Sequence, residues 1–152
     1  MCYYTLLYTV TQAMRHEISD KKFLEHAEVH GCLYGTSFES LEAVWRTNRI
    51  CLLDIDVNGV KQIKKSPGFR GRYVFLMPPD IGELEKRLRG RGTESNEQIE
   101  RRMKAAEDEM EYATGDDEPF DFILINGDLK ESERLLTERL KEWFPDVAWD
   151  GE

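Results

Sequence analysis

The chain has 152 residues, enough for one compact domain with a sizeable core. Acidic residues outnumber basic ones by 30 to 21, and the net charge of −9 disfavours non-specific binding to nucleic acid, which needs a basic face. No stretch approaches the ~20 apolar residues that cross a bilayer, so we expect no membrane partner. The three scattered cysteines lack metal-ligand spacing and are typical of a cytosolic protein with reduced thiols.

The first predicted elements are a strand and a short helix. Residues 3–10 are rich in aromatic and β-branched side chains, which predicts a strand. Thr11 is suited to cap a helix that carries Met14 and Ile18. Farther along, Glu25 follows an apolar pair, so we expect it at a strand end, beside packed surface.

Two hydroxyl residues compete to begin the next helix. Thr36 precedes Glu39 by three residues, the spacing of a capping box, whereas Ser37 is an alternative N-cap. The helix is predicted because apolar residues recur on one of its faces. These residues are Leu41, Val44 and Trp45.

Residues 50–59 are the stretch around which the chain is organised. Four consecutive apolar residues predict a strand buried on both faces, as in the parallel sheet of an α/β protein. Asp54 and Asp56 follow and, because strand side chains alternate, point to the same side. Acids at the carboxyl end of a parallel strand suggest a ligand site. Alternatively, they cap a turn or helix that begins through Asn58 and Gly59, and the spacing favours neither interpretation.

The alternation of strands and helices continues in the second half. A short helix is predicted over residues 59–65, and a buried strand over residues 72–77. Asp80 and Glu83 have the spacing that caps a further helix.

An arginine cluster lies at the end of that helix. Arg87, Arg89 and Arg91 surround Gly90 and Gly92. Cations at a helix C-terminus favour the helix dipole, but three arginines and two glycines in so short a stretch exceed what capping requires. Guanidinium groups match phosphate oxygens in pairs, and glycines let the backbone move as a lid. The cluster therefore predicts a phosphate-binding lid.

The last predicted elements are a long helix, a strand over residues 122–125 and a final helix. Asp128 and Glu131 are spaced to cap the final helix, which stops at Pro145. The long helix is predicted from one apolar stripe, formed by Ile99, Met103, Ala106, Met110 and Ala113.

Five motifs together resemble the guanylate kinase family, in its order and spacing. They are residues 23–27, 33–37, 53–60, 87–94 and 126–129. The resemblance implies an α/β fold, with a P-loop kinase-like parallel sheet and helices on both faces. It also implies four parts of the chain: a remnant of the GMP-binding subdomain (1–37), core strands and helices (38–86), a lid (87–102) and a C-terminal core part (103–152).

The resemblance also implies a substrate site. Glu25, Thr36 and Asp56 correspond to residues that contact guanine, and Tyr34 to one that contacts its phosphate. A carboxylate such as Glu25 can accept hydrogen bonds from both N1–H and the exocyclic amine of guanine, a match that adenine cannot make. Asp54 is implied to bind Mg²⁺ through water.

The same resemblance assigns the phosphate clamp. Arg87, Arg91 and Arg102 correspond to the arginines that clamp the transferred phosphates as the lid closes, and Asn126 lies beside the adenine of ATP. Clamping the charge of the phosphate oxygens is most of what phosphoryl transfer requires. Gly127 stands where the family has an acid.

One part of the family's machinery does not occur in the sequence. The glycine-rich loop that ends in Gly-Lys-Ser/Thr and holds the ATP phosphates is missing. The arginines that grip the GMP phosphate, which should precede the first residues, are missing too. The chain therefore resembles a guanylate kinase that lacks its N-terminal third, including the phosphate-loop strand.

Two functions remain open at this point. The family reaction is the phosphorylation of GMP to GDP by ATP with Mg²⁺, which here implies a cytoplasmic enzyme impaired by the missing loop. The alternative is a non-catalytic guanylate kinase-like module that binds a phosphorylated peptide. The missing loop favours the module, whereas Glu25, Asp56 and the lid arginines favour nucleotide binding. The sequence indicates no oligomeric state.

Overall fold

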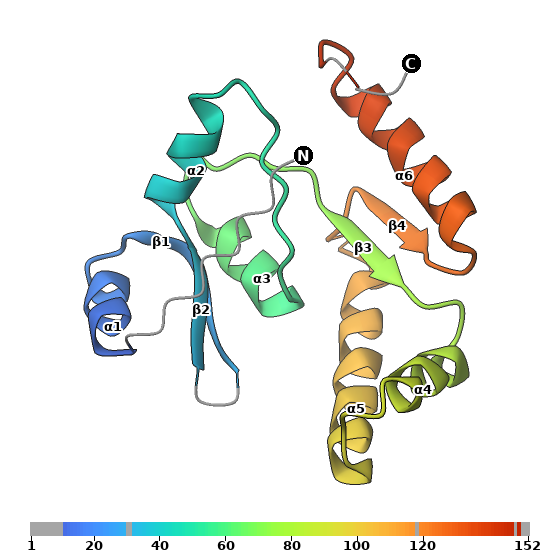
Figure 1. Ribbon diagram of the computed structural model, residues 1–152. Coiled ribbons are helices and arrows are strands. Elements are labelled where there is room, and N and C mark those ends of the chain that lie inside the picture. The colour runs from blue at the N-terminus through green and yellow to red at the C-terminus, as the bar shows by residue number, and fades with distance from the viewer. Residues whose placement is uncertain (1–10, 30–31, 118, 148, 150–152) are drawn as a thin grey trace. The chain divides into compact units, whose positions relative to one another are not determined.

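The computed structural model describes residues 11–29, 32–117, 119–147 and 149, which contain six helices and four short strands (Figure 1). The strand predicted at residues 3–10 lies outside this set. The chain divides into two compact units, Met1–Gly71 and Arg72–Glu152. Among the described residues, no helix is both long and apolar enough to cross a membrane.

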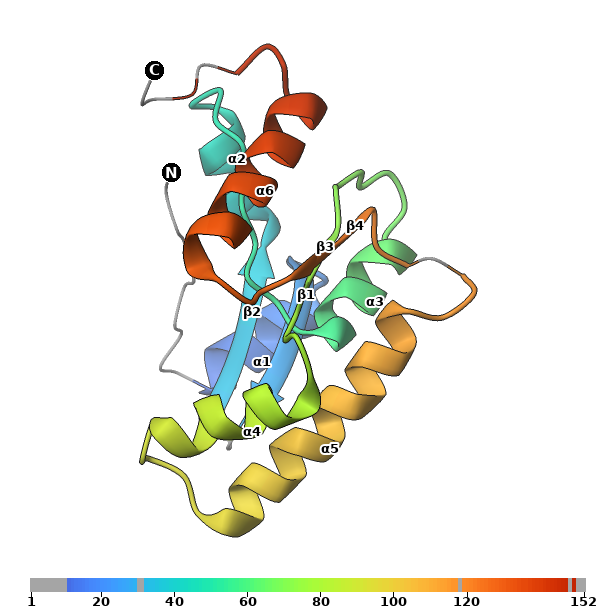
Figure 2. The same cartoon turned by 90° about the vertical axis from the view of Figure 1, so that its right-hand side faces the viewer.

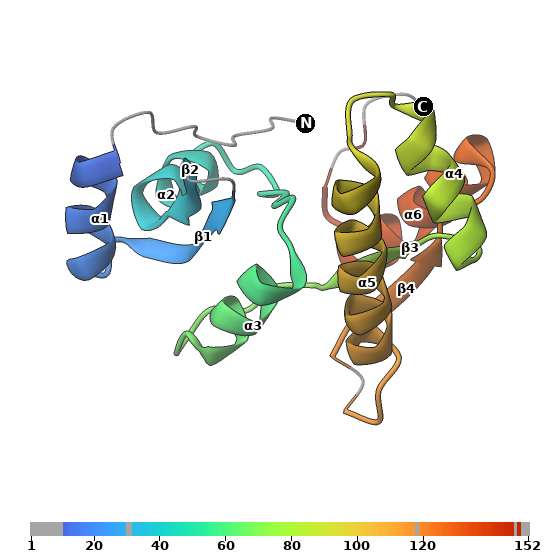
Figure 3. The same cartoon turned by 90° about the horizontal axis from the view of Figure 1, so that it is seen from below.

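The first unit is built on an antiparallel hairpin of β1 (Phe23–Val29) and β2 (Cys32–Ser37). The helices α1 (Thr11–Ser19) and α3 (Val57–Lys65) lie on opposite sides of this hairpin, and α2 (Phe38–Trp45) continues from β2 (Figures 1 and 3). Apolar side chains from all three helices and both strands form its core. They are Met14, Leu24, Leu33, Leu41, Val44, Val57, Val60 and Ile63.

Side-chain caps explain where α2 and α3 begin. Ser37, not Thr36, is the N-cap of α2, and its hydroxyl accepts a hydrogen bond from the Ser40 N–H at 3.1 Å. Asp56 is the N-cap of α3, and its carboxylate accepts from the Gly59 N–H at 2.7 Å. The capping interpretation of Asp56 is thus confirmed, while Thr36 remains free for another contact.

Residues 50–56 form neither strand nor helix, so the strand predicted there is wrong. A strand exists through hydrogen bonds to a neighbour, and none of the described strands pairs with this segment. Its apolar run is also less buried than predicted, with Leu52 41% exposed. Apolar composition alone therefore did not make this segment a strand.

The second unit contains a parallel pair of strands. β3 (Val74–Met77) pairs with β4 (Phe122–Ile125) along their whole length. The helices α4 (Ile81–Gly90) and α5 (Asn96–Ala113) connect them and lie side by side, whereas α6 (Leu129–Trp143) follows β4 (Figure 2). A parallel strand pair joined through helices confirms the predicted α/β class.

One edge of β3 is open in the described part of the chain. The carbonyls of Tyr73 and Met77 accept hydrogen bonds from amides of β4 and of the residue after it, at 3.2 and 2.7 Å. Because strand residues alternate in the edge that they face, the N–H and C=O groups of Val74 and Leu76 face the other edge. None of the described strands pairs with that edge, and the Leu76 side chain is 57% exposed.

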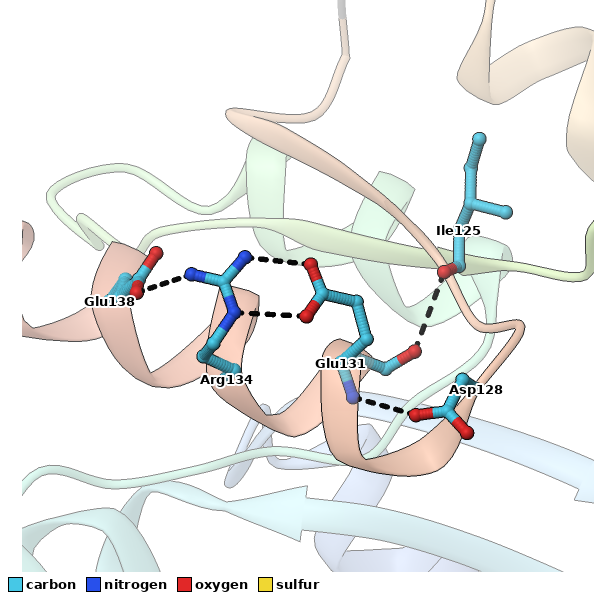
Figure 4. Close-up of polar contacts among 6 residues, drawn as sticks. Ile125, Asp128, Glu131, Arg134 and Glu138 are labelled. Carbon is cyan, nitrogen blue, oxygen red and sulfur yellow. Dashed lines mark hydrogen bonds and ion pairs between the residues drawn. The ribbon is translucent and has the colours of Figure 1, made fainter.

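The first turn of α6 is hydrogen-bonded to the end of β4 (Figure 4). The Asp128 carboxylate accepts from the Glu131 N–H at 3.0 Å, which confirms the predicted cap. The hydroxyl of buried Ser132 donates to the Ile125 carbonyl at 3.4 Å. These contacts fix where the strand ends and the helix begins.

An exposed ion-pair network follows on α6. The Arg134 guanidinium lies between Glu131 and Glu138 and donates to both (Figure 4). These hydrogen bonds raise the pKa of Arg134, and the bond from Arg134 lowers the pKa of Glu131. Because the three groups are exposed to water, we expect the network to add little stability.

Candidate functional site

The centre of the candidate site is a buried carboxylate on the hairpin. Glu25 is only 6% exposed, and its Oε1 accepts a hydrogen bond from the Thr36 hydroxyl at 2.6 Å. The two residues are direct partners in the β1–β2 register and therefore lie on one face of the hairpin. Glu25 occupies the middle of β1, not its end as predicted, and no described residue forms an ion pair with it.

The helix α3 brings a second carboxylate to Glu25. Gly59 joins the two groups, because its N–H donates to Asp56 while its Cα lies against Glu25. A Cβ at this position would stand 3.3 Å from the Glu25 Oε2 and 3.2 Å from the Ile55 Cβ. A glycine here lets the helix and the strand approach closely, and each of the two acids then lies beside Gly59.

Tyr34 lies on the same face of the hairpin as Glu25 and Thr36. It stands two residues before Thr36 on β2 and pairs with Ala27. Its side chain is half-buried, and no described residue hydrogen-bonds to its hydroxyl. The first unit therefore contains all four predicted substrate residues, Glu25, Tyr34, Thr36 and Asp56, and the Thr36 and Glu25 side chains are in direct contact.

Asp54, the predicted metal residue, is exposed, and no described residue donates a hydrogen bond to it. Among the described residues there is no group of three or more His, Cys, Asp or Glu that could hold a metal ion by itself. Mg²⁺ commonly uses only one or two carboxylates together with substrate phosphates and water. A single available carboxylate fits that pattern.

Arg87 is already engaged with protein acceptors in the second unit. It donates to the Glu83 carboxylate at 2.8 Å, to the Asn126 carbonyl at 2.9 Å and to the Gly127 carbonyl at 3.4 Å. The predicted clamp residue Arg87 and the predicted adenine residue Asn126 are thus in direct contact. The Asn126 backbone is itself fixed, because its N–H donates to the Met77 carbonyl at 2.7 Å.

The other two predicted clamp arginines differ in their surroundings. Arg91 is exposed at the end of α4, and no described residue hydrogen-bonds or ion-pairs with its guanidinium. Arg102 pairs with Glu94 at 2.9 Å. The other Glu94 carboxylate oxygen is buried, with no hydrogen-bond partner among the described residues. Gly90 is the last residue of α4, whereas Gly92, with φ of 65°, makes the turn that follows.

Three residues shape these sites through contacts that the sequence did not predict. Gly59 provides the close approach to Glu25, Glu94 holds Arg102, and Gln62 hydrogen-bonds the backbone of β1. Gly59 lies within the motif 53–60 and Glu94 within the motif 87–94, so membership of these motifs is the sequence signal that could have identified them. Gln62 carried no signal, because its partner is 36 residues away in the chain.

Comparison with known proteins identifies the family. A family model for guanylate kinase matches residues 3–143. Guanylate kinases from Sus scrofa and Homo sapiens are 44% and 42% identical over 138 residues, which is 89% of this chain and 68% of each relative. Guanylate kinase 1 from Arabidopsis thaliana is 46% identical over 125 residues, but the match spans only 32% of that protein.

A solved structure supports the fold. The crystal structure of guanylate kinase from Anaplasma phagocytophilum matches with a TM-score of 0.67 at 24% identity, covering 90% of this chain and 63% of that one. The predicted P-loop kinase-like fold is thereby confirmed. Since the family model spans nearly the whole chain and relatives exceed 40% identity over most of it, this protein belongs to the guanylate kinase family.

Proposed function

We propose that this chain binds GMP as the acceptor for phosphoryl transfer from ATP. The observation that carries the proposal is the Glu25 carboxylate, which is buried, bonded to Thr36 and without a cationic partner among the described residues. A buried carboxylate is costly unless strong hydrogen bonds compensate for the lost water. Guanine offers N1–H and an exocyclic amine side by side, and adenine lacks this pair of donors.

Asp56 and Tyr34 extend the recognition. Capping of α3 uses only the Oδ1 atom of Asp56, and the Oδ2 atom accepts no hydrogen bond from a described residue. We assign this second oxygen to the guanine amine. Tyr34, on the face of the hairpin that carries Glu25, donates its hydroxyl to the GMP phosphate.

The arginines bind the phosphates in two ways. Arg91 is free to contact phosphate at once, whereas Arg87 and Arg102 must exchange their protein acceptors for phosphate oxygens. Such an exchange couples phosphate binding to movement of the segment 87–102, which we propose as the lid. Paired guanidinium contacts then stabilise the charge that develops on the transferred group.

Mg²⁺ and ATP complete the proposal. Asp54 would hold the metal through water, and the metal would supply charge neutralisation at the ATP phosphates. Asn126 would lie beside the adenine. We place this reaction in the cytoplasm, where cysteines stay reduced and nucleotide substrates are present.

The proposal is tested by calorimetric titration of the full chain with GMP and with AMP. GMP should bind more tightly, and Glu25→Gln should weaken GMP by roughly 1–3 kcal/mol because a charged acceptor is lost. Glu28→Gln is the matched control, since Glu28 is exposed on the same strand and, among the described residues, forms an ion pair only with Arg15. Equal affinity for the two nucleotides would refute the assignment of guanine.

A further inference from the structure

We propose that Gln62 is a positioning residue that locks α3 against β1 and so sets the spacing of the two guanine-binding carboxylates. This inference rests on the proposed recognition of GMP by Glu25 and Asp56. The Gln62 Nε2 donates to the His26 carbonyl at 2.8 Å, and its Oε1 accepts from the His26 N–H at 3.1 Å. One side chain thus satisfies both backbone groups of one strand residue.

The pair of bonds replaces a neighbouring strand. In an antiparallel hairpin, successive residues turn their N–H and C=O groups to opposite edges. Since His26 bonds to Gln62, its backbone groups face the edge of β1 that β2 does not cover. An amide of this length supplies one donor and one acceptor, as a strand would. A methionine side chain has the same length but neither the N–H donor nor the carbonyl acceptor, and a glutamate side chain has acceptors but no N–H donor.

The lock acts on the residues that recognise guanine. Gly59 and Gln62 are three residues apart on α3 and so share one face of the helix. Gly59 lies against Glu25, and Gln62 binds His26, the next residue of β1. Two adjacent strand residues, Glu25 and His26, therefore each contact one of two helix residues that lie one turn apart, and we call this pairing the match between β1 and α3.

Loss of this match would separate the carboxylates. Asp56 is bound to the first turn of α3 through the Gly59 N–H, so it moves with the helix. Glu25 belongs to β1 and stays with the hairpin. A slide of α3 along β1 would therefore change the distance between the two acids without altering either residue. Specificity for guanine depends on that distance, because each acid must reach its donor.

The test compares Gln62→Met with the full wild-type chain by calorimetry, using GMP, IMP and AMP. IMP keeps N1–H but lacks the exocyclic amine, so the ratio of GMP to IMP affinity reports on the spacing of the acids. We expect the GMP affinity to fall about tenfold, as for the loss of one well-placed hydrogen bond, while the AMP affinity stays within about twofold. Lys65→Met is the matched control, because it places the same new side chain at an exposed position of the same helix.

Hydrogen exchange separates this inference from the proposed function. The His26 amide should exchange faster in Gln62→Met whether or not the wild-type chain prefers GMP. If the wild type shows no preference for GMP, the proposed function fails and this amide still tests the lock. A folded Gln62→Met variant with unchanged GMP to IMP and GMP to AMP ratios would overturn the positioning role. Gln62→Glu keeps only the acceptor and should lower the same two affinity ratios. It replaces Gln62→Met as the test variant if the Met variant does not fold.

Discussion

Gly59 is the residue on which both carboxylates of the site depend. Its N–H holds Asp56 at 2.7 Å, and the absence of a side chain lets Glu25 approach. A methyl group here would meet the Glu25 carboxylate at 3.3 Å and the Ile55 side chain at 3.2 Å, closer than ordinary contact. The positions of the two carboxylates thus depend on a residue that has no side chain.

We predict that Gly59→Ala weakens both GMP binding and the fold. The added methyl must push Ile55 or Glu25 aside, and such overpacking typically costs ~1–3 kcal/mol. Calorimetry and urea denaturation measure the two effects. Gly90→Ala is the matched control for the stability measurement alone, because Gly90 belongs to the proposed lid but is helical with nothing within 4 Å of an added Cβ. Because Gly90 is the last residue of α4, that control should leave the free energy of unfolding unchanged or raise it slightly. Unchanged GMP affinity in Gly59→Ala would contradict the close approach.

At this scale, the sequence predicted which residues belong to the site but not how they contact one another. The motifs indicated Glu25 and Thr36 as guanine contacts, and the structure places the two in direct contact. The sequence left open whether Thr36 or Ser37 caps the next helix. That choice depends on the β1–β2 register, because Thr36 faces Glu25 and Ser37 then stands at the start of α2.

At the scale of elements, helix starts were predicted well because capping is local. The predicted caps Asp80 and Asp128 each accept a hydrogen bond from a backbone N–H three residues later in the chain. Such contacts need no distant partner. The strand expected at residues 50–55 is the opposite case, because a strand requires a second segment beside it.

We predict that Asp128→Ala destabilises the second unit by ~0.5–2 kcal/mol through loss of the α6 cap. The mutant leaves the Glu131 N–H without its acceptor at 3.0 Å. Urea denaturation followed by circular dichroism measures the change. Asp116→Ala, an exposed aspartate that caps no described helix, should alter stability far less. Equal effects of the two substitutions would argue against a capping role.

At the scale of the whole molecule, two segments lack a strand partner in the described part of the chain. These are residues 50–56 and the outer edge of β3. Exposed strand edges tend to recruit other strands. Leu52 in the first segment and Leu76 in β3 both have exposed side chains, as does Ile125 in the paired strand β4.

Hydrogen exchange of the full chain tests this description. We predict rapid exchange at Leu52 and Leu53, whose segment pairs with no described strand. Phe122 and Asn126 should exchange slowly, because their amides donate to carbonyls of Tyr73 and Met77 at 3.2 and 2.7 Å. Strong protection of Leu52 in a monomer would show that this segment has a strand partner in solution.

We also predict that this chain phosphorylates GMP far more slowly than a typical kinase, which turns over at ~1–100 s⁻¹. Its sequence contains no glycine-rich loop ending in Gly-Lys-Ser/Thr, and losing even one transition-state donor costs ~10²–10³ in rate. A coupled assay of ADP release measures turnover, with calorimetric GMP binding as the control for a folded site. Turnover in the typical range would mean that ATP is held by other residues.

The sequence by itself determined what depends on neighbouring residues. It predicted the family, the α/β class and the caps at Asp80 and Asp128, because motifs, apolar periodicity and N-cap chemistry are local patterns. Only the tertiary structure decided which groups meet across long separations. It showed Gln62 against His26, Glu25 against Gly59, and no described strand paired with residues 50–56. The physical reason is that hydrogen bonds and close packing between distant segments follow from register and helix docking, which no local pattern encodes.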